Sequence, residues 1–460
     1  MIGVLAAVVL AAVGAFLYFR SGSNDSHYAA LEQHRQQQAA QAPAAAPAAT
    51  ATPVAEASPT VSPSPGAAAP TASTGRNYWT TFRGPKRDGN YEATPVLTSW
   101  PAGGLSPIWK QPIGLGFASF AIADGRAYTI EQRRGQEVVA AYDIGTGREL
   151  WKQAWNAEYN DSTGDGPRST PTWDQGRVYA LGATGELRCI DANNGSVIWG
   201  KNILTDNQAE NLQWAMAASP LIVDDKVIVL PGGTNGKSVV AYNKMTGAPV
   251  WKVLNDRQAY VSPMLVELAG RRQIVVVSAS RVVGLAPENG ALLWNYPWDT
   301  DMGINASLPV MVDRNRFFIS SGYGKGAALV AVKGSGSNFT ATTIWENINM
   351  KNKFNSSVLH NGHVYGLDEG ILTCLDVNTG ERKWKGGRYG YGQVILASGH
   401  LIVSSDAGDV ALVKATPAQY TEVARFSALQ GKTWNYPAIA DGRLLVRNAN
   451  EMAAYDISPK

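Results

Sequence analysis

The chain has 460 residues, of which 40 are Lys or Arg and 37 are Asp or Glu, so its formal net charge is only +3. It has no basic run and no cluster of basic and aromatic residues, which excludes nucleic acid as a partner. A chain of this length would ordinarily form two or three domains. The repeats described below indicate one closed array instead, in which each unit contacts mainly its neighbours.

The first element in the chain is an apolar stretch. Ile2–Phe19 is 18 consecutive residues without a charge, and Arg20 follows it. That length is about the minimum for a helix that spans a membrane. A cleaved signal peptide is the alternative, but the basic residues that normally precede its apolar run are missing. We therefore predict a transmembrane anchor over residues 1–20.

A low-complexity stretch comes next. From residue 39 to residue 74 the chain consists almost entirely of Ala, Pro, Ser and Thr, and Glu56 is its only charge. Such a segment buries too little apolar surface to offset the entropy of ordering it, and its prolines keep it extended. We predict a disordered linker over residues 21–76 that holds the following domain away from the bilayer.

Residues 77–104 lead into the folded domain. This segment is rich in aromatic residues, and we expect three of them to pack on the outside of that domain: Trp79, Phe82 and Trp100.

From residue 105 to residue 460 one short pattern recurs eight times. An apolar strand ends at Asp or Asn, a Thr-Gly or Asn-Gly pair follows, and a Trp comes four residues after the Gly. The clear copies are at 143–151, 191–199, 243–251 and 376–384, and looser copies are at 286–294, before Trp345 and at 414–426. The eighth copy is split between 453–457 and 108–111. A period of about 40–50 residues is typical of an array of identical units.

Each repeat contains four strand signals. Pairs such as Asp124-Gly125, Asn361-Gly362 and Asp441-Gly442 accept a positive φ and close tight hairpins. The strand after each pair is nearly all apolar, as a strand buried on both faces should be. Four antiparallel strands in each of eight repeats predict an all-β fold, an eight-bladed β-propeller over residues 105–460.

One large aromatic residue occupies the same position in each repeat. An indole ring there can bury roughly 150–250 Å² between neighbouring blades. The split repeat further predicts that the strand around Trp109 pairs with residues 453–457 and closes the ring, which hides edges that would otherwise pair with other chains. These docking residues are Trp109, Trp151, Trp199, Trp251, Trp294, Trp345 and Trp384, with Phe426 in the remaining repeat.

This repeated element resembles the tryptophan-docking repeat of the pyrroloquinoline quinone (PQQ) type propellers. That group includes quinoprotein alcohol dehydrogenases and the outer-membrane assembly lipoprotein BamB. The lead-in YWTTFRGPKRDG at 78–89 is also similar to the start of many such propellers. The resemblance covers residues 105–460 and implies the fold, but one fold of this kind carries many functions.

The two cysteines occupy equivalent positions in two repeats. Cys189 precedes Asp191 and Cys374 precedes Asp376, which places them in blades 2 and 6 when blades are counted from Trp151. Those blades are opposite each other in an eightfold ring, whereas a disulfide needs Cα atoms within about 7 Å. We expect two unpaired, buried cysteines.

The resemblance also defines what a redox enzyme of this fold would need. The dehydrogenases it points to use PQQ with Ca²⁺ or another metal, a catalytic Asp, often an adjacent pair of cysteines and sometimes a haem. This sequence has no adjacent cysteines and no C-x-x-C-H haem motif, and no catalytic Asp or metal-binding pair can be aligned. We therefore expect no catalytic residue, no metal and no cofactor, and favour a non-catalytic scaffold over the alternative, a PQQ- and Ca²⁺-dependent alcohol or sugar dehydrogenase.

A binding site, if present, is predicted where the loops that enter the inner strands converge at one mouth of the axial channel. Aromatic and amide side chains at these positions either bind a peptide, a glycan or a quinone, or simply plug the channel. The residues are Arg168, Trp214, Tyr260, Asn305, Asn355, Tyr391, Trp434 and Asn435. Because the resembled propellers are exported, we expect a periplasmic domain that is anchored to the inner membrane and binds another protein of the cell envelope.

Overall fold

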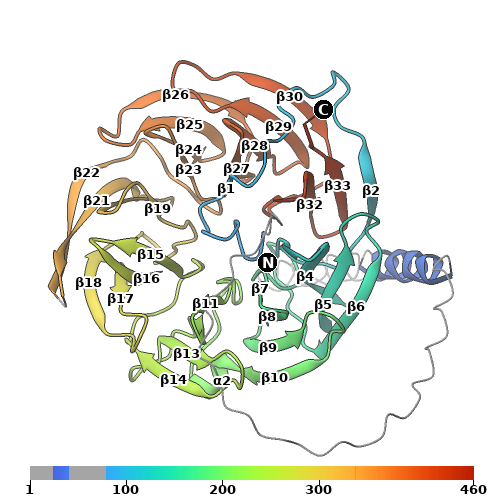
Figure 1. Ribbon diagram of the computed structural model, residues 1–460, viewed down its shortest axis with the longest axis horizontal. Coiled ribbons are helices and arrows are strands. Elements are labelled where there is room, and N and C mark those ends of the chain that lie inside the picture. Colours follow the sequence, from blue (N-terminus) through green and yellow to red (C-terminus); the bar gives the residue numbers. More distant parts are fainter. Residues whose placement is uncertain (1–23, 41–78, 337, 460) are drawn as a thin grey trace, which may run out of the picture.

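The computed structural model describes residues 24–40, 79–336 and 338–459. Eight sheets, each with four antiparallel strands, form a closed ring, which Figure 1 shows down its axis. One of these sheets also has a short fifth strand, β1 (Asn90–Tyr91), which pairs in parallel. The predicted eight-bladed all-β propeller is therefore confirmed. The apolar stretch at 2–19 lies outside the described residues, and no helix within them combines the length and the apolar character needed to cross a bilayer.

Each blade runs from an inner strand at the axis to an outer strand at the edge of the ring. Blade 1 consists of β3 (Ala121–Ala123), β4 (Arg126–Arg133), β5 (Gln136–Asp143) and β6 (Glu149–Asn156), and blade 2 consists of β7 (Thr172–Asp174), β8 (Arg177–Leu181), β9 (Glu186–Asp191) and β10 (Val197–Asn202). Blade 3 consists of β11 (Leu221–Val223), β12 (Lys226–Val229), β13 (Val239–Asn243) and β14 (Pro249–Val253), and blade 4 consists of β15 (Met264–Leu268), β16 (Arg271–Val277), β17 (Arg281–Leu285) and β18 (Leu292–Pro297). Blade 5 consists of β19 (Val310–Met311), β20 (Arg316–Ser321), β21 (Gly326–Ser335) and β22 (Asn338–Asn347). Blade 6 consists of β23 (Val358–His360), β24 (His363–Asp368), β25 (Ile371–Asp376) and β26 (Arg382–Arg388), and blade 7 consists of β27 (Gln393–Ala397), β28 (His400–Ser404), β29 (Asp409–Lys414) and β30 (Glu422–Ser427). A short helix, α2 (Ile203–Asn207), follows blade 2.

Blade 8 closes the ring with strands from both ends of the domain. Its inner three strands are β31 (Ala438–Ala440), β32 (Arg443–Arg447) and β33 (Glu451–Asp456), and its outer strand is β2 (Pro107–Pro112). β2 pairs antiparallel with β33, and Trp109 lies opposite Ala454. The predicted closure by the split repeat is confirmed.

The docking tryptophans connect each blade to the next. The Trp151 indole N–H donates to the carbonyl oxygen of Ala192 in the turn of blade 2, at 2.9 Å. The Gly195 of that turn has a φ of +78°, and a Cβ there would lie 2.7 Å from the Trp151 ring, so only glycine fits both the turn and the contact. The same indole-to-carbonyl bond is made by Trp109 to Ile144, Trp199 to Lys244, Trp251 to Pro287, Trp345 to Val377 and Trp384 to Thr416.

Two blades depart from this arrangement. Trp294 donates to Gln273 within its own blade at 2.5 Å, because β21 and β22 of the next blade form a long hairpin without the repeated turn. Phe426 has no N–H to donate, and Trp100 packs edge-on against it with ring centroids 5.6 Å apart. Thus Trp100 packs at the outer edge of the ring.

The cysteines are unpaired and buried, as expected. Cys189 lies on β9 of blade 2 and Cys374 on β25 of blade 6. Burial raises the pKa of Cys189 to about 11 and that of Cys374 to about 12, so both are packed as neutral thiols.

The lead-in segment runs through the axis of the ring, which corrects the prediction that Trp79 and Phe82 pack on the outside. Trp79 pairs with Ile122 of β3, in blade 1, and is only 1% exposed. The chain then crosses the axis, and β1 (Asn90–Tyr91) pairs in parallel with β27 of blade 7. Figure 1 shows β1 inside the ring. Hydrophobicity and the motif alone could not distinguish an aromatic residue inside the channel from one outside it.

Two buried arginines fix this segment, which we call the axial plug (residues 79–91). Arg83 donates to the carbonyl oxygens of Ser356, Ser357 and Val394 in blades 6 and 7. Arg87 donates to main-chain and hydroxyl oxygens of blades 2 to 4, on the opposite side of the axis. Its acceptors there are the carbonyl oxygens of Ser219, Pro220 and Pro263 and the Thr172 hydroxyl, and it also donates to the Thr81 hydroxyl of the plug itself. A guanidinium carries five donors in a fixed fork, which suits several acceptors converging from different blades.

Residues 24–40 form a helix, although they lie within the predicted linker. Two of its residues, Tyr28 and Leu31, are buried, and the face that continues from them at helical spacing contacts the ring. His27 bonds the carbonyl oxygen of Ile113 at 2.8 Å, and Glu32 accepts from Arg134 at 2.8 Å. The low-complexity composition that favours disorder begins at residue 39, at the end of this amphipathic helix.

The helix covers a buried charge cluster on blade 1. The Glu131 carboxylate is inaccessible to solvent and accepts from the Tyr142 hydroxyl at 2.7 Å and from Arg133 Nε at 2.9 Å. Arg35 of the helix donates to the same hydroxyl at 3.0 Å. Burial alone would raise the pKa of Glu131, but the charges of Arg133, Arg447 and Arg35 outweigh it and lower the pKa to about 2.

This cluster predicts acid sensitivity. In the unfolded chain Glu131 titrates near its ordinary value of about 4.5, so its stabilising contribution is complete above that pH and is lost as the pH falls towards 2. The difference corresponds to about 3 kcal/mol at most. We expect Glu131→Gln to lower the free energy of unfolding, measured with urea, at pH 5. The difference from the unmodified chain should become smaller as the pH is lowered from 5 to 2. The exposed Glu92→Gln is the matched control; a loss that does not change with pH would contradict the assignment.

Candidate functional site: the aromatic pocket at the mouth

The loops between blades gather on one face of the ring. Every inner strand begins after such a loop and ends at the hairpin turn on the opposite face. We call the first face the mouth. A pocket of about 220 Å³ opens there, and the side chain of Phe82, from the axial plug, contributes to its lining. The pocket is lined by Phe82, Phe117, Thr163, Arg168, Trp214, Ala217, Tyr260, Ser262, Ile304, Ala306, Leu308, Tyr323, Phe354, Trp434 and Tyr436.

The walls are two groups of aromatic rings. Trp434 stacks on Phe117 with ring centroids 5.7 Å apart, and its centroid lies 5.1 Å from that of Phe354. Trp214 and Tyr260 form the second group, with centroids 5.9 Å apart. The Trp434 loop is held because Gln393 donates to the Trp434 carbonyl oxygen at 2.8 Å. These side chains are only partly buried, so the rings present open apolar surface to a ligand.

Arg168 forms a fixed ion pair at the edge of this pocket. Its guanidinium lies 2.5 Å from Asp161 Oδ2 and 5.2 Å from the centroid of Phe117. Burial lowers the pKa of Arg168, while the charge of Asp161 opposes that effect. Burial would also raise the pKa of Asp161, but hydrogen bonds from Thr163 and the charge of Arg168 outweigh it and lower that pKa. Both groups are therefore charged at neutral pH.

The structure divides the eight predicted mouth residues into two sets. Arg168, Trp214, Tyr260 and Trp434 line the pocket. Tyr391 adjoins it, edge-on to Trp434 with centroids 5.8 Å apart.

The three asparagines of that prediction lie behind the mouth. Asn305, Asn355 and Asn435 are at most 3% exposed. Asn435 donates to the carbonyl oxygens of Gly116 and Ala118, and Asn305 donates to that of Ser278. Their amides satisfy buried main-chain groups between blades, so they position the loops and do not face the pocket.

Several lining residues lie outside the eight positions predicted from the sequence. Phe117, Tyr323 and Phe354 precede or interrupt the strand signals and carry no repeated spacing. Phe82 and Tyr436 pack edge-on with centroids 5.0 Å apart, which joins the axial plug to blade 8. The excess of aromatic residues in the loops between blades could have indicated Phe117 and Phe354, whereas Tyr323 lies in the β20–β21 turn within blade 5.

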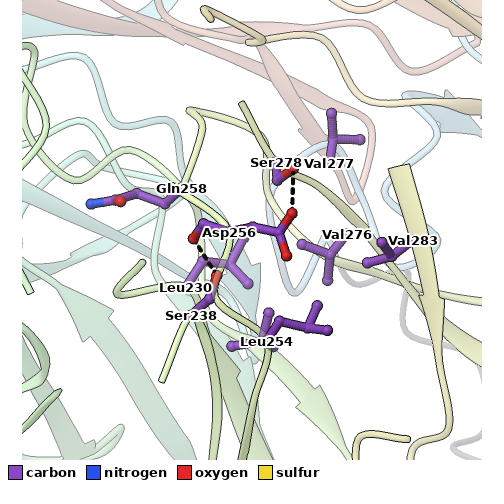
Figure 2. Close-up of a pocket in the computed structure, with 10 residues that line it drawn as sticks. Leu230, Ser238, Leu254, Asp256, Gln258, Val276, Val277, Ser278 and Val283 are labelled. Atoms are coloured by element: carbon purple, nitrogen blue, oxygen red, sulfur yellow. Dashed lines mark hydrogen bonds between the residues drawn. The ribbon is translucent and has the colours of Figure 1, made fainter. Parts of the chain in front are cut away.

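A second, smaller cavity lies between blades 3 and 4. Figure 2 shows Asp256 beside it, with Ser278 Oγ 3.4 Å from the Asp256 carboxylate and Ser238 Oγ 2.6 Å from the Asp256 carbonyl oxygen. Its volume is about 10 Å³, close to the least that holds one water molecule. Asp256 is already paired with Arg281 at 2.7 Å. The cavity is a packing void at a joint between blades.

Carboxylates are missing from the lining of the mouth pocket, as far as the structure describes the chain. Across residues 24–40, 79–336 and 338–459, no three His, Cys, Asp or Glu side chains gather as a metal site would require. The pocket therefore supplies aromatic faces, hydroxyls and one paired guanidinium.

Comparisons with known proteins agree with this architecture. In sequence, the chain is 26% identical over 190 residues to the quinohemoprotein alcohol dehydrogenase ADH-IIG of Pseudomonas putida, a match that covers 39% of this chain. The match takes in 24% of the relative, so the chain spans about a quarter of the length of that curated protein.

Solved structures show the same fold at low sequence identity. BamB from Moraxella catarrhalis superposes with a TM-score of 0.55 at 18% identity, covering 77% of this chain and 98% of that one. The quinohemoprotein alcohol dehydrogenase ADHIIG of Pseudomonas putida HK5 gives a TM-score of 0.60 at 13% identity, covering 84% and 81%.

The family comparison covers a longer stretch of the sequence. The family model described as outer membrane protein assembly factor BamB matches residues 135–386, which is more than half of the chain and extends from blade 1 to blade 6. Together with the docking tryptophans and the closed eight-bladed ring, this match shows that the chain belongs to the PQQ-like propeller family of the outer membrane protein assembly factor BamB.

Proposed function

We propose that this propeller is a non-catalytic binding scaffold of the cell envelope and that the mouth pocket holds an apolar segment of a partner protein. The observation that carries the proposal is the pocket itself, about 220 Å³ in volume, with rings of Phe117, Trp214, Tyr260, Phe354 and Trp434 in its walls. Half-buried aromatic side chains clustered in a concave surface are typical of the residues that dominate protein binding. Membership of a family described as an assembly factor supports the same role.

The residues of the mouth do not fit the PQQ and Ca²⁺ of the alternative function. Ca²⁺ takes six to eight oxygen ligands, with carboxylates prominent among them, whereas no described residue that lines the pocket is a carboxylate. Arg168, the one cation among the described residues that line the pocket, is already paired with Asp161. The axial plug, with Arg83 and Arg87, also fills the channel below the pocket. We therefore derive no dehydrogenase step at this site.

Replacing Trp434 by Ala tests the binding function. The ring contacts Phe117, Phe354 and Tyr391, so its loss opens one whole wall of the pocket. We expect at least a tenfold weaker affinity for short apolar peptides, measured by fluorescence anisotropy with labelled peptides, because truncating a central aromatic residue typically costs 2 kcal/mol or more of binding energy.

The matched control is Ile344→Ala, which removes an apolar side chain that is 47% exposed on β22, away from the mouth. It should leave the affinity unchanged. Equal affinities for the Trp434 and Ile344 variants would contradict a binding site at the mouth. Alcohol-dependent dye reduction by the chain after incubation with PQQ and Ca²⁺ would contradict the non-catalytic role.

We also propose that residues 1–20 anchor the chain in the inner membrane with the propeller in the periplasm. The support is the uncharged stretch Ile2–Phe19. Protease added to intact spheroplasts should then digest the propeller, and full protection of it would refute this location.

A further inference from the structure

We infer that the mouth pocket selects a peptide segment in which an aromatic side chain is flanked by carboxylates. This inference rests on the proposed function and specifies the chemistry of its ligand. It follows from the charges that surround the aromatic walls.

Two lysines extend the aromatic walls with positive charge. Lys432 Nζ lies 3.7 Å from the ring centroid of Trp434 and 5.7 Å from that of Phe117. On another part of the rim, Lys353 Nζ lies 5.4 Å from the centroid of Tyr391 and 5.9 Å from that of Tyr323. Each lysine lies one or two positions before a pocket residue in a loop between blades. The Lys432 ammonium also donates to the main-chain carbonyl oxygen of Thr163, which lines the pocket, and this bond holds it beside the opening.

These positions also decide which ligand charge the pocket accepts. An aromatic face attracts a cation, but here the protein's own lysines already lie over Trp434 and Tyr391. A cationic ligand would meet a like charge at each of these faces, which is unfavourable. A carboxylate beside the bound ring would instead approach two ammonium groups, each with three N–H donors, of which Lys432 gives one to the Thr163 carbonyl oxygen.

The acids near the rim do not cancel this preference. Asp161 is engaged by Arg168, and Asp406 accepts from the main-chain N–H of Tyr391 at 3.2 Å. Asp301 is exposed beside Gly324 of blade 5. None of the three lines the pocket. The two lysines, in contrast, lie over aromatic rings that line the pocket or adjoin it.

Three matched peptides test this inference on the purified full chain: acetyl-Asp-Phe-Asp-amide, acetyl-Asn-Phe-Asn-amide and acetyl-Lys-Phe-Lys-amide. Titration by calorimetry in 20 mM salt should give the tightest binding to the acidic peptide, by about threefold to tenfold over the neutral one, since each solvent-exposed ion pair contributes modestly. The basic peptide should bind most weakly. The preference should shrink in 0.5 M salt, where exposed charges are screened.

The double variant Lys353→Met/Lys432→Met keeps much of each apolar stem and removes both charges. It should bind the acidic and neutral peptides equally, while Lys432→Arg should preserve the preference. If the three peptides bind the unmodified chain equally well, or the basic peptide binds best, the inference is overturned although the pocket still binds apolar groups. If none of them binds, the proposed function itself fails.

Discussion

Arg87→Ala is expected to lower the free energy of unfolding by about 2–6 kcal/mol, because it leaves two buried carbonyl oxygens unsatisfied at about 1–3 kcal/mol each. The Arg87 side chain is fully buried and is bound only by neutral oxygens, among them the carbonyl oxygens of Ser219 and Pro263. Burial lowers its pKa to about 9, so it still carries its charge at neutral pH. Removing it leaves the carbonyl oxygens of Ser219 and Pro263, from blades 3 and 4, without this donor, whereas the Pro220 carbonyl oxygen still accepts from the Thr172 hydroxyl.

Urea unfolding followed by tryptophan fluorescence measures this effect. Lys86→Ala is the control, because Lys86 is the adjacent residue of the same segment and its side chain is 68% exposed in a surface ion pair with Glu92. Arg87→Lys should lie between the two, since an ammonium keeps the charge but offers fewer donors. A stability for Arg87→Ala equal to that of Lys86→Ala would show that the axial plug contributes little to the ring.

Trp151→Ala is expected to destabilise the ring by about 3–5 kcal/mol, as large-to-small changes of buried aromatic residues do. The Trp151 ring packs on Gly195 of blade 2 and lies 5.9 Å from the Tyr128 ring, and its N–H donates to Ala192. The substitution therefore opens a cavity at the joint between two blades and also removes a hydrogen bond across it.

Trp151→Phe separates these two contributions. Phenylalanine retains most of the buried ring but cannot donate to Ala192, so we expect a loss of about 1–2 kcal/mol. Thermal unfolding followed by near-ultraviolet circular dichroism measures the series. Val197→Ala, at a 41% exposed position on the same blade as the Ala192 turn, should be nearly neutral. If Trp151→Ala were as mild as Val197→Ala, docking of the indole could not be what joins these blades.

The repeated turn made the ring predictable from sequence. Asp191, Gly195 and Trp199 form a local pattern with a local cause: Asp191 Oδ1 accepts from the main-chain N–H of Asn193 at 2.8 Å, and the glycine takes a φ of +78°. Because each turn also receives the indole of the preceding blade, the same three residues encode both the hairpin and its contact with a neighbour. Counting the copies of this pattern then gives the number of blades, and the split copy identifies the strand that closes the ring.

The axial plug and the N-terminal helix could not be predicted in this way. Arg83 and Arg87 make contacts with residues that lie more than 100 positions away, and nothing in their own segment indicates those partners. The helix at 24–40 has an amphipathic pattern, but Arg35 and Glu32 are polar residues whose positions become meaningful only beside blade 1. Long-range polar contacts produce no regular spacing of residues in a sequence, whereas packing of each repeat against the next produces a regularly spaced apolar pattern.

At the mouth, the sequence likewise does not predict which way a single polar side chain points. Trp214, Tyr260 and Trp434, which were predicted from their loop positions, line one pocket. Loop position could not show that the Asn435 amide turns towards Gly116 and Ala118, away from the opening. For a polar residue at the end of a strand, the decision between binding a ligand and satisfying a buried carbonyl depends on the neighbouring blade.

The order of attachments along the N-terminal part of the chain has a mechanical consequence. Along the chain from its N-terminal side, the helix at 24–40 is the first segment attached to the ring, the axial plug at 79–91 is the second, and β2, which completes blade 8, is the third. Tension applied ahead of residue 24 must therefore peel off the helix and extract the plug before any load reaches the strand that fastens the ring. The helix and the axial plug therefore detach in series, and the pairing of β2 with β33 is the last contact at this end of the chain to break.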